Sequence, residues 1–237
     1  MPDKCKFHDC TVNGVPLATY GGASLLDYSI GETPVTPAIF QGVNRTSWNL
    51  LKNIFGMRDI TLTVVFEAED LRQAKRNRSA LNAALFEKSE LFIPDDGFYY
   101  DVYCTGTGAE TLIGIGSNTA QIKSDYHFKG IRHDALQTVT LPAGDTLYCS
   151  STAPVTDCRL TATVGTSGSN YQLGGAVFAT VTAGDVLVFD GIDGKITKNG
   201  VNAATSVVWV NFPQLVPGPN VIDCDDDVTV QYAPTYI

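Results

Sequence analysis

Apolar and polar residues alternate in short runs along most of the chain, as they do in strands that bury one face. The clearest run is ITLTVVF (60–66), which alternates and then ends in three apolar residues. Further strand-like runs are LLDYSIG (25–31), LFIP (91–94), FYYDVYCTG (98–106), QIKSDYHFKGI (121–131), SVVWVNF (206–212) and DVTVQY (227–232). The pattern predicts a mainly β protein.

One stretch, AEDLRQAKRNRSALNAALFEK (68–88), has helical spacing instead. Mostly apolar residues recur every three or four positions and so share one side of a helix. All of this side except the guanidinium group of an arginine can face a core. The residues on this side are Leu71, Ala74, Arg78, Leu81 and Leu85. Glu69 and Asp70 in the first turn and Lys88 in the last match the helix dipole. We therefore expect one main helix near 68–88.

The segments between these runs carry turn signals. TVNGVPL (11–17) predicts a hairpin, because Asn-Gly suits a two-residue turn. ETPVTPA (32–38) is expected to be an extended loop, since its prolines limit backbone pairing. GTGAETLIGIGSNT (106–119) is glycine-rich and predicts a second loop, and Asp95, Asp96 and Gly97 predict a turn.

The pattern changes after Arg132, where helical spacing disappears. Turn-like dipeptides then recur at the intervals of an all-β sandwich; they are Ala143-Gly144, Gly174-Gly175, Ala183-Gly184, Asp193-Gly194 and Asn199-Gly200. VLVFDGIDGKITKNGV (186–201) predicts two strands linked by a hairpin. We place a domain boundary near 134–144, with an N-terminal β domain that holds the helix at 1–140 and a C-terminal β-sandwich at 141–237.

The segment FPQLVPGPNVI (212–222) interrupts the chain between two apolar runs. Pro217 presets its φ, and Gly218 can take a positive φ, as the central positions of a type II turn require. Pro219 has no backbone N–H and so cannot lie inside a central strand. Together with Asn220, these residues predict a structural turn at a corner of the fold.

Charge argues against two classes of partner. The formal net charge is −9 over 237 residues, and from Asp145 onward nine aspartates face three basic residues. Sequence-independent binding to DNA or to an anionic membrane needs a basic surface. No run of about 18 apolar residues predicts a membrane span. We therefore expect neither nucleic acid nor membrane as a partner.

The cysteines predict a reducing compartment. The start, MPDKCKFHDCTV, has no apolar segment of the signal-peptide type, and the chain has six cysteines. Without a secretion signal, they are expected to be buried or incidental thiols. Whether Cys149 and Cys158 pair is left open by their spacing.

Candidate metal ligands are sparse. Cys5, His8 and Cys10 form C-x2-H-x-C, but a structural zinc site needs four ligands, and only Cys104 or His127 could complete this one. The run DCDDD (223–227), with Asp190 and Asp193, lacks the spacing of a calcium loop. We expect no metal site and no cofactor.

Catalytic signatures are absent from the sequence as well. The serines lack a G-x-S-x-G elbow, and the cysteines lack C-x-x-C spacing. His127 stands between Tyr126 and Phe128 and is expected on the opposite face of its strand. The basic residues of the helix, Arg72, Lys75, Arg76 and Arg78, either contact an acidic neighbouring subunit or form a solvated face, and the second interpretation is favoured. The sequence therefore predicts no enzyme and no catalytic residue.

Several motifs, in their order along the chain, resemble one family: the distal tail proteins of siphophages. They are the helix 68–88 followed by LFIPDDGFYYDVYCTG, the strand QIKSDYHFKGIRH (121–133), then GDVLVFDGIDGKITKNG (184–200) and the corner FPQLVPGPNVI. The resemblance spans essentially the whole chain. It implies that the C-terminal sandwich is galectin-like, or jelly-roll-like, and that the proline-rich corner closes it.

The resemblance also implies a structural role. Such a protein forms a homohexameric ring, the baseplate hub at the tail tip of the virion, and is made in the cytoplasm of the host bacterium. Its implied partners are the tail tube protein on one side and a tail-associated lysin or fibre protein on the other, with a receptor-binding protein as a further candidate. The N-terminal domain would then form the ring.

Two segments are predicted to contribute to the contacts between subunits: the loop Thr33 to Phe40 and WNLLKNIF (48–55). The second carries more apolar surface than a loop between strands usually exposes, and such patches mark interaction sites. The candidate interface residues are Pro34, Pro37, Phe40, Trp48, Leu51 and Phe55. The alternative is that this segment packs in its own core.

A second hypothesis is a lectin-like module that recognises cell-wall sugar of the host. Galectin-like folds stack a sugar ring on an exposed aromatic side chain, and Trp209 is the tryptophan of this half. The half has no histidine, and no glutamate follows Asp145, so its set of polar sugar-binding residues is poor. Trp209 lies in an apolar run and is expected in the core, which favours the structural role.

Overall fold

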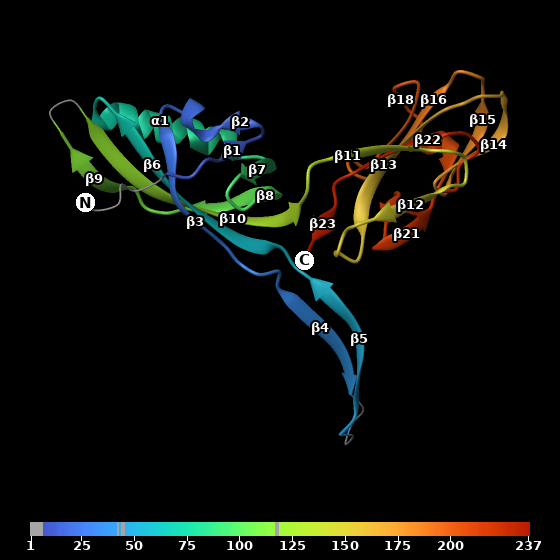
Figure 1. Cartoon of the computed structure of the whole chain (residues 1–237), viewed down its shortest axis with the longest axis horizontal. Helices are drawn as coiled ribbons and strands as arrows, with labels where there is room; N and C mark the ends of the chain where they lie inside the picture. Colours follow the sequence, from blue (N-terminus) through green and yellow to red (C-terminus); the bar gives the residue numbers. More distant parts are fainter. Residues whose placement is uncertain (1–6, 42, 44–45, 117–118) are drawn as a thin grey trace. The chain divides into compact units, whose positions relative to one another are not determined.

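The computed structural model describes residues 7–41, 43, 46–116 and 119–237. It divides into two compact units between His133 and Asp134 (Figure 1). Strands predominate in both units, and the predicted mainly β fold is confirmed. Within the described residues, no helix has the length and apolar character that a membrane crossing needs.

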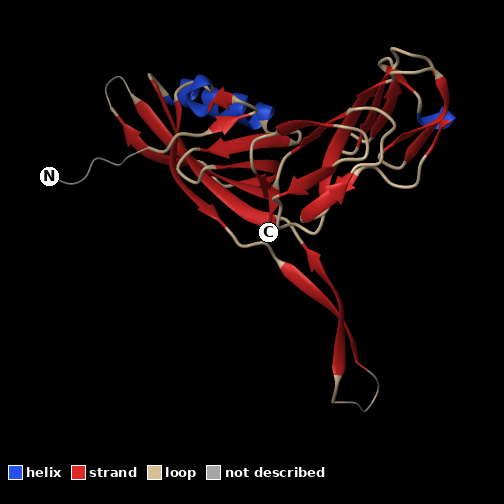
Figure 2. Ribbon diagram, turned by 45° about the vertical axis from the view of Figure 1, so that its right-hand side comes forward, coloured by secondary structure: helices blue, strands red, loops and turns tan. Residues whose placement is uncertain are grey.

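The first unit is built on one antiparallel sheet with the strand order β2-β1-β7-β8-β10-β6-β3, and β9 also pairs with β10. The helix α1 (Leu71–Ala84) covers one face of this sheet (Figure 2). A short 3₁₀ helix, η1, spans Leu17–Thr19. The strands are β1 (Thr11–Val12), β2 (Val15–Pro16), β3 (Ala23–Ile30), β6 (Arg58–Ala68), β7 (Ser89–Ile93), β8 (Phe98–Thr107), β9 (Thr111–Ile115) and β10 (Ala120–His133).

Period-two burial along β10 explains the core of this unit. Ile122, Tyr126 and Phe128 point to the helix side and are buried, whereas His127 is exposed, as predicted from its neighbours. The helix supplies Ala74 and Leu81, which join the same apolar cluster. Burying these matched faces removes apolar surface from water, which is the main stabilising contribution to such a packing.

The helix is shorter than predicted. Asp70 precedes it as the N-cap, and its side chain accepts a hydrogen bond from the backbone N–H of Gln73 at 2.7 Å. At the other end, the N–H of Leu85 bonds to the carbonyl of Asn82, which tightens the last turn and ends the helix. The predicted places of Glu69 and Asp70 in the first turn and of Lys88 in the last turn are wrong, because the helix runs from Leu71 to Ala84 and β7 begins at Ser89.

The hairpin at 11–17 is confirmed: Asn13 and Gly14 both have positive φ, as a type I′ turn requires. Two loop predictions are wrong. Residues 106–119 contain strand β9, which pairs with β10. The loop predicted at 32–38 overlaps β4 (Val35–Gln41), which pairs with β5 (Trp48–Phe55); among the described strands, these two pair only with each other.

The prolines of this segment explain why its sequence pattern predicts a loop and not strand β4. Pro37 lies opposite Asn53 in the middle of the ribbon. Each strand of a two-stranded ribbon has one open edge, so a proline can face that edge without removing a ladder hydrogen bond. Proline counts against a strand only where both edges of that strand are paired, so its presence does not exclude a strand in a two-stranded ribbon.

The second unit contains three groups of strands: β11-β22-β13-β16-β17-β18 with β20 paired to β13, the group β14-β15-β19, and the ribbon β12-β21. Leu160, Phe189 and Val230 lie at the centre of its core. A 3₁₀ helix, η2, spans Ala204–Ser206. The strands are β11 (Gln137–Leu141), β12 (Thr146–Cys149), β13 (Thr156–Thr163), β14 (Gly168–Leu173), β15 (Ala176–Val181), β16 (Val186–Asp190), β17 (Lys195–Lys198), β18 (Val201–Asn202), β19 (Val207–Val208), β20 (Gln214–Leu215), β21 (Gly218–Val221), β22 (Val228–Tyr232) and β23 (Thr235–Tyr236).

The predicted hairpin at 186–201 is confirmed as β16 and β17, whose strands pair directly. The predicted strand 206–212 is reduced to β19. Beyond Val208 the chain leaves the sheet, and Trp209 and Phe212 instead pack on each other with ring centroids 4.6 Å apart. Aromatic packing against the core thus replaces strand pairing in this segment.

Candidate assembly surface

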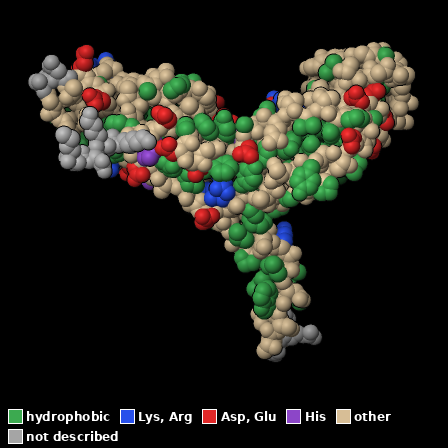
Figure 3. Space-filling view, viewed as in Figure 1, with side chains coloured by type: hydrophobic (Ala, Val, Ile, Leu, Met, Phe, Trp, Pro, Cys, Tyr) green, Lys and Arg blue, Asp and Glu red, His purple; other side chains and the backbone are tan. Residues whose placement is uncertain are grey.

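The ribbon β4–β5 carries many of the exposed apolar residues of the first unit; we call it the arm, residues Val35–Phe55. In Figure 1 it extends away from the large sheet of the same unit, and Figure 3 shows hydrophobic side chains along its visible face. Its large apolar residues are exposed, with relative exposures of 49% for Val35, 55% for Ile39, 60% for Phe40, 91% for Val43, 59% for Trp48, 50% for Leu50, 67% for Leu51 and 51% for Ile54.

The register of the arm sorts these residues onto two faces. Cross-strand partners share a face, and successive residues alternate. The pairs Val35–Phe55, Ile39–Leu50 and Gln41–Trp48 therefore lie on one face with Pro37. The other face carries Phe40 and Ile54, whereas Leu51 falls at the register shift and has no partner across the ribbon. Both faces are apolar, which an isolated surface hairpin would not need.

Charge adds to the contrast with the rest of the chain. Between Thr33 and Phe55 the sequence has two basic residues and no acidic one, in a chain of net charge −9. Of the two, Lys52 lies within β5, opposite Ala38. The arm is therefore an apolar, weakly basic surface on an acidic protein.

The base of the arm is held by backbone hydrogen bonds. The N–H of Gly56 donates to the carbonyl of Pro34, and the N–H of Gly31 donates to the carbonyl of Asp59, both at 2.8 Å. The buried guanidinium of Arg58 donates to the carbonyl of Gly31 at 3.1 Å. A Cβ on Gly56 would stand 2.8 Å from the Pro34 ring, so the close approach at the base needs glycine.

The residues predicted for the subunit interface occupy this arm and its base. Pro34, Pro37, Phe40, Trp48 and Leu51 are exposed, and Phe55 is half-buried. The alternative of a segment packed in its own core does not describe this structure, because none of the six lies in the core cluster. Val35 and Ile39 lie within the predicted segment Thr33 to Phe40 and are exposed as well.

The predicted turn residues lie at the start of β21. Gly218 has φ +92°, a region that favours glycine. The side chain of Asn220 accepts a hydrogen bond from the N–H of Val216 and donates to the carbonyls of Val216 and Gly218, each at 2.8 Å. Asparagine thus closes the corner through its side chain, a role that sequence analysis did not specify.

The candidate metal and thiol residues are not brought together. Cys5 lies outside the described residues. His8 pairs with Asp95 at 2.5 Å, whereas Cys10 is buried, and neither belongs to a group of metal-ligating side chains within the described part of the chain. Cys149 and Cys158 are free and buried. Burial raises the pKa of Cys158 to about 12, so its thiol is not ionised at neutral pH.

Half of the basic helix face is used within the chain. Lys75 contacts Glu110 at 2.7 Å, and Arg78 contacts the same carboxylate at 3.7 Å. Arg72 and Arg76 remain exposed. The favoured interpretation as an ordinary solvated face is consistent with these internal pairs.

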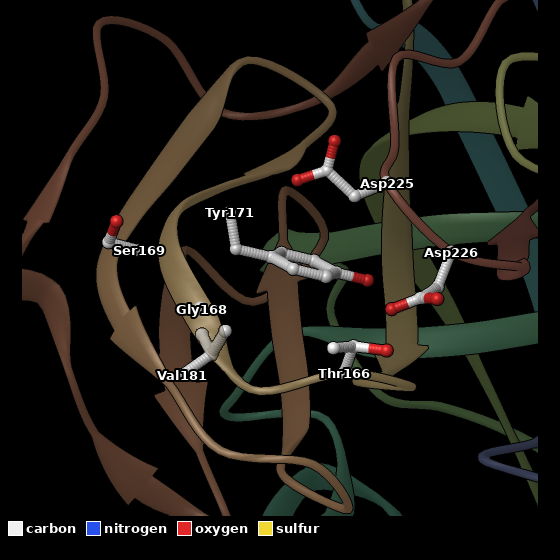
Figure 4. Close-up of a pocket in the computed structure, with 7 residues that line it drawn as sticks. All are labelled: Thr166, Gly168, Ser169, Tyr171, Val181, Asp225 and Asp226. Carbon is white, nitrogen blue, oxygen red and sulfur yellow. The ribbon is translucent and has the colours of Figure 1, made fainter.

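A shallow cavity of about 240 Å³ lies in the second unit. Figure 4 shows the buried ring of Tyr171 between its walls, with its hydroxyl on the side of Asp225 and Asp226. One oxygen of each carboxylate already accepts a backbone hydrogen bond, from Gln172 and Gly165 respectively. These aspartates therefore serve the local fold, and the cavity offers no catalytic arrangement.

Trp209 does not form an open stacking platform. It is half-buried and packs against Phe189 and Phe212 at the edge of the core. The expectation that it belongs with the core is therefore confirmed.

Comparison with known proteins agrees with this architecture. The model of the family described as siphovirus-type tail component, C-terminal domain, matches residues 142–236. The crystal structure of the Dit protein of phage SPP1 matches with a TM-score of 0.67 and 12% identity, over 98% of this chain and 100% of that one. A chain of the phage p2 baseplate, in its activated conformation with strontium, matches with a TM-score of 0.53 and 11% identity, over 95% of this chain and 97% of that one.

A search of curated proteins finds no match to the sequence. At identities near one in eight, the structural matches show the fold alone, and the family match is confined to residues 142–236. The match of residues 142–236 to this family model, together with the fold of the whole chain, supports a siphophage distal tail protein.

Proposed function

We propose that this protein is the distal tail hub of a long-tailed bacteriophage. Six copies form a ring that joins the tail tube to the tail-tip apparatus for host adsorption. The tail tube protein lies on one side of the ring, and a tail-associated lysin or fibre protein, with or without a receptor-binding protein, on the other. The role is structural and involves no catalysis.

The arm carries this proposal. A two-stranded hairpin is at best marginally stable alone in water, and exposed apolar patches of this extent mark interaction sites. Eight large apolar residues in the described part of the arm are exposed in their own chain. A second copy of the protein would supply it, and a surface on one protomer that meets a different surface on the next gives a head-to-tail contact, which closes into a ring when the rotation fits.

The comparisons support the same role. The structure of SPP1 Dit is described as a paradigm of the hub of the adsorption apparatus in phages that infect Gram-positive bacteria. The match covers 98% of this chain and 100% of that one, so the similarity of fold extends over both units. The second unit matches a tail component family by itself.

Light scattering and negative-stain imaging of the purified chain test the ring. We expect a six-fold ring for the wild type, and monomers when the paired arm residues Ile39 and Leu50 are both changed to glutamate. A matched control changes Val201 and Val210, which are 70% and 84% exposed in the second unit, to glutamate. A wild type that stays monomeric at high concentration, or an arm variant that still forms rings, would overturn the proposal.

The lectin-like alternative gains no specific support. Its stacking residue, Trp209, is engaged in the core. Saturable binding of host wall polysaccharide that Trp209→Ala abolishes without loss of folding would reverse this ranking.

A further inference from the structure

Three side chains of metal-ligating type meet on the face of the first sheet opposite the helix. They are Glu90 from β7, Asp101 from β8 and His133 from β10, and their ligand atoms all lie within 4.8 Å of one another. Within the described ranges, no other such group of three was found. The three residues are far apart in the sequence and meet only because β8 lies between β7 and β10.

The register forces two carboxylates together. Glu90 and Asp101 are direct cross-strand partners, and like charges in that position destabilise a sheet. Lys88 offsets part of this repulsion, with its Nζ 2.7 Å from Asp101 Oδ2. Among the described residues, Glu90 has no cationic partner of its own, so the pair retains uncompensated negative charge.

His133 completes the cluster from the other side of β8. On β10, Ile131 lies opposite Asp101, so His133 is two residues further on and on the same face. Its Nε2 is 3.8 Å from Asp101 Oδ1. The imidazole stacks on Tyr99 at 5.8 Å, and Tyr99 stacks on Phe92 at 4.4 Å. With an exposure of 8%, this ring is held in place rather than free to turn.

The donor set indicates the class of ion. One imidazole nitrogen and two carboxylates suit zinc or manganese, whereas calcium and magnesium prefer oxygen ligands alone. Zinc bonds to these atoms at about 2.0–2.2 Å, so its ligand atoms stand roughly 3.4 Å apart in a tetrahedron. The ligand atoms lie within 4.8 Å of one another, so an ion would draw them closer, a change that rotation of the two carboxylate side chains would have to supply.

We propose that Glu90, Asp101 and His133 form a binding site for a divalent transition-metal ion of the zinc class, which links β7, β8 and β10. The ion replaces Lys88 as the partner of Asp101 and leaves at least one coordination position for water. Because its ligands come from three strands of one sheet, binding stabilises the first unit, in the same way that any ligand of the folded state does.

Titration of the chelator-treated full chain tests this site. We expect one Zn²⁺ per chain by calorimetry and elemental analysis, and a melting temperature of the first unit that rises by on the order of 5–10 °C when the ion is in hundredfold excess over its Kd. Glu90→Gln keeps the shape of the side chain and removes one ligand charge. It should weaken binding by at least about tenfold.

The matched control is Glu87→Gln, which changes the charge by the same amount on an exposed neighbour outside the cluster. It should bind as the wild type does. Substitution with Co²⁺ separates this site from one built on the cysteines, since thiolate ligation adds a charge-transfer band in the near ultraviolet that nitrogen and oxygen ligands do not. No stoichiometric Zn²⁺ binding, equal affinity in wild type and Glu90→Gln, a thiolate band, or a preference for Ca²⁺ would each overturn the proposal.

Discussion

Each unit contains a two-stranded ribbon, and the two ribbons differ in whether their apolar residues are buried by their own chain. The arm exposes apolar residues on both faces, whereas the ribbon β12–β21 buries one face in the core of its unit through Leu147 and Cys149. Its outer face carries Tyr148 and Val221, which are 72% and 71% exposed. A two-stranded ribbon needs packing on at least one face. The second ribbon finds it within the chain, and the arm must find it elsewhere.

The largest effect is expected from removing the arm. Replacing residues 35–55 by a short Gly–Ser turn should abolish ring formation, because it deletes the apolar surface that a neighbouring copy covers. The melting temperature of the first unit should stay that of the wild-type monomer, since the arm contributes nothing to its core cluster. Light scattering and calorimetry measure both outcomes. Rings that persist would place the main contact on the sheet instead.

Two leucine-to-alanine substitutions, one in each ribbon, should differ in their effect on the free energy of unfolding. Leu147→Ala should lower the free energy of unfolding of the second unit by about 2–5 kcal/mol, because it leaves a cavity in a packed core. Leu51→Ala should change the stability of the monomer by less than about 0.5 kcal/mol, as an exposed position does. Urea denaturation of dilute protein compares the two. A large loss for Leu51→Ala would mean that the arm packs within its own chain.

Substitutions of Gly218, at the corner where β21 begins, should lower the stability of the second unit by amounts that depend on the new side chain. A Cβ added at Gly218 meets no atom within 4 Å, so the first cost of a substitution is the backbone torsion. That cost is on the order of 1–2 kcal/mol, and Gly218→Val should be worse than Gly218→Asn, since β-branched residues tolerate a positive φ least. The measurement is the melting temperature of the second unit.

The same valine variant should still form rings, while residues from about 144 onward become sensitive to protease. Equal melting temperatures for the two variants would contradict the turn. Loss of the ring would show that the corner, and not only the arm, takes part in assembly.

The smallest effect concerns pH, and it should appear in the second unit but not in the arm, which has no carboxylate. Lys198, with the Thr182 N–H and Asn199, lowers the pKa of Asp185 from 3.8 to about 2. A depressed pKa contributes stability that is present above pH 4 and is lost as the pH falls toward 2. Asp185→Asn should flatten this part of the stability curve of the second unit. An unchanged acid limb would show that Asp185 does not contribute to it.

The sequence predicts most strands and the helix, because their signals lie within a few neighbouring residues. Alternation along ITLTVVF and DVTVQY, the spacing of Leu71, Ala74 and Leu81, and the Asn13–Gly14 turn each depend on a few neighbouring residues. Errors arose where a neighbour in space decided the outcome. β9 forms in a glycine-rich segment because β10 offers an edge to pair with, and Trp209 leaves its strand to pack on Phe189 and Phe212.

The sequence predicts which segments carry the candidate assembly surface, but it does not predict that they form a paired ribbon. The apolar character of residues 48–55 was visible in the sequence, since hydrophobicity belongs to the residues themselves. That these residues pair with 35–41, and that both faces then stay uncovered, depends on the register and on the absence of a third layer over the ribbon. Neither property has a local signal.

The sequence by itself determined the period of the strands, the position of the helix, the turns at Gly-containing pairs and the acidic charge, because these follow from side chains and backbone torsions a few residues apart. Only the tertiary structure decided which apolar face finds a partner within the chain. It also brought Glu90, Asp101 and His133 together across three strands. Such contacts depend on strand order, which here brings His133 to Glu90 although the sequence keeps them 43 positions apart.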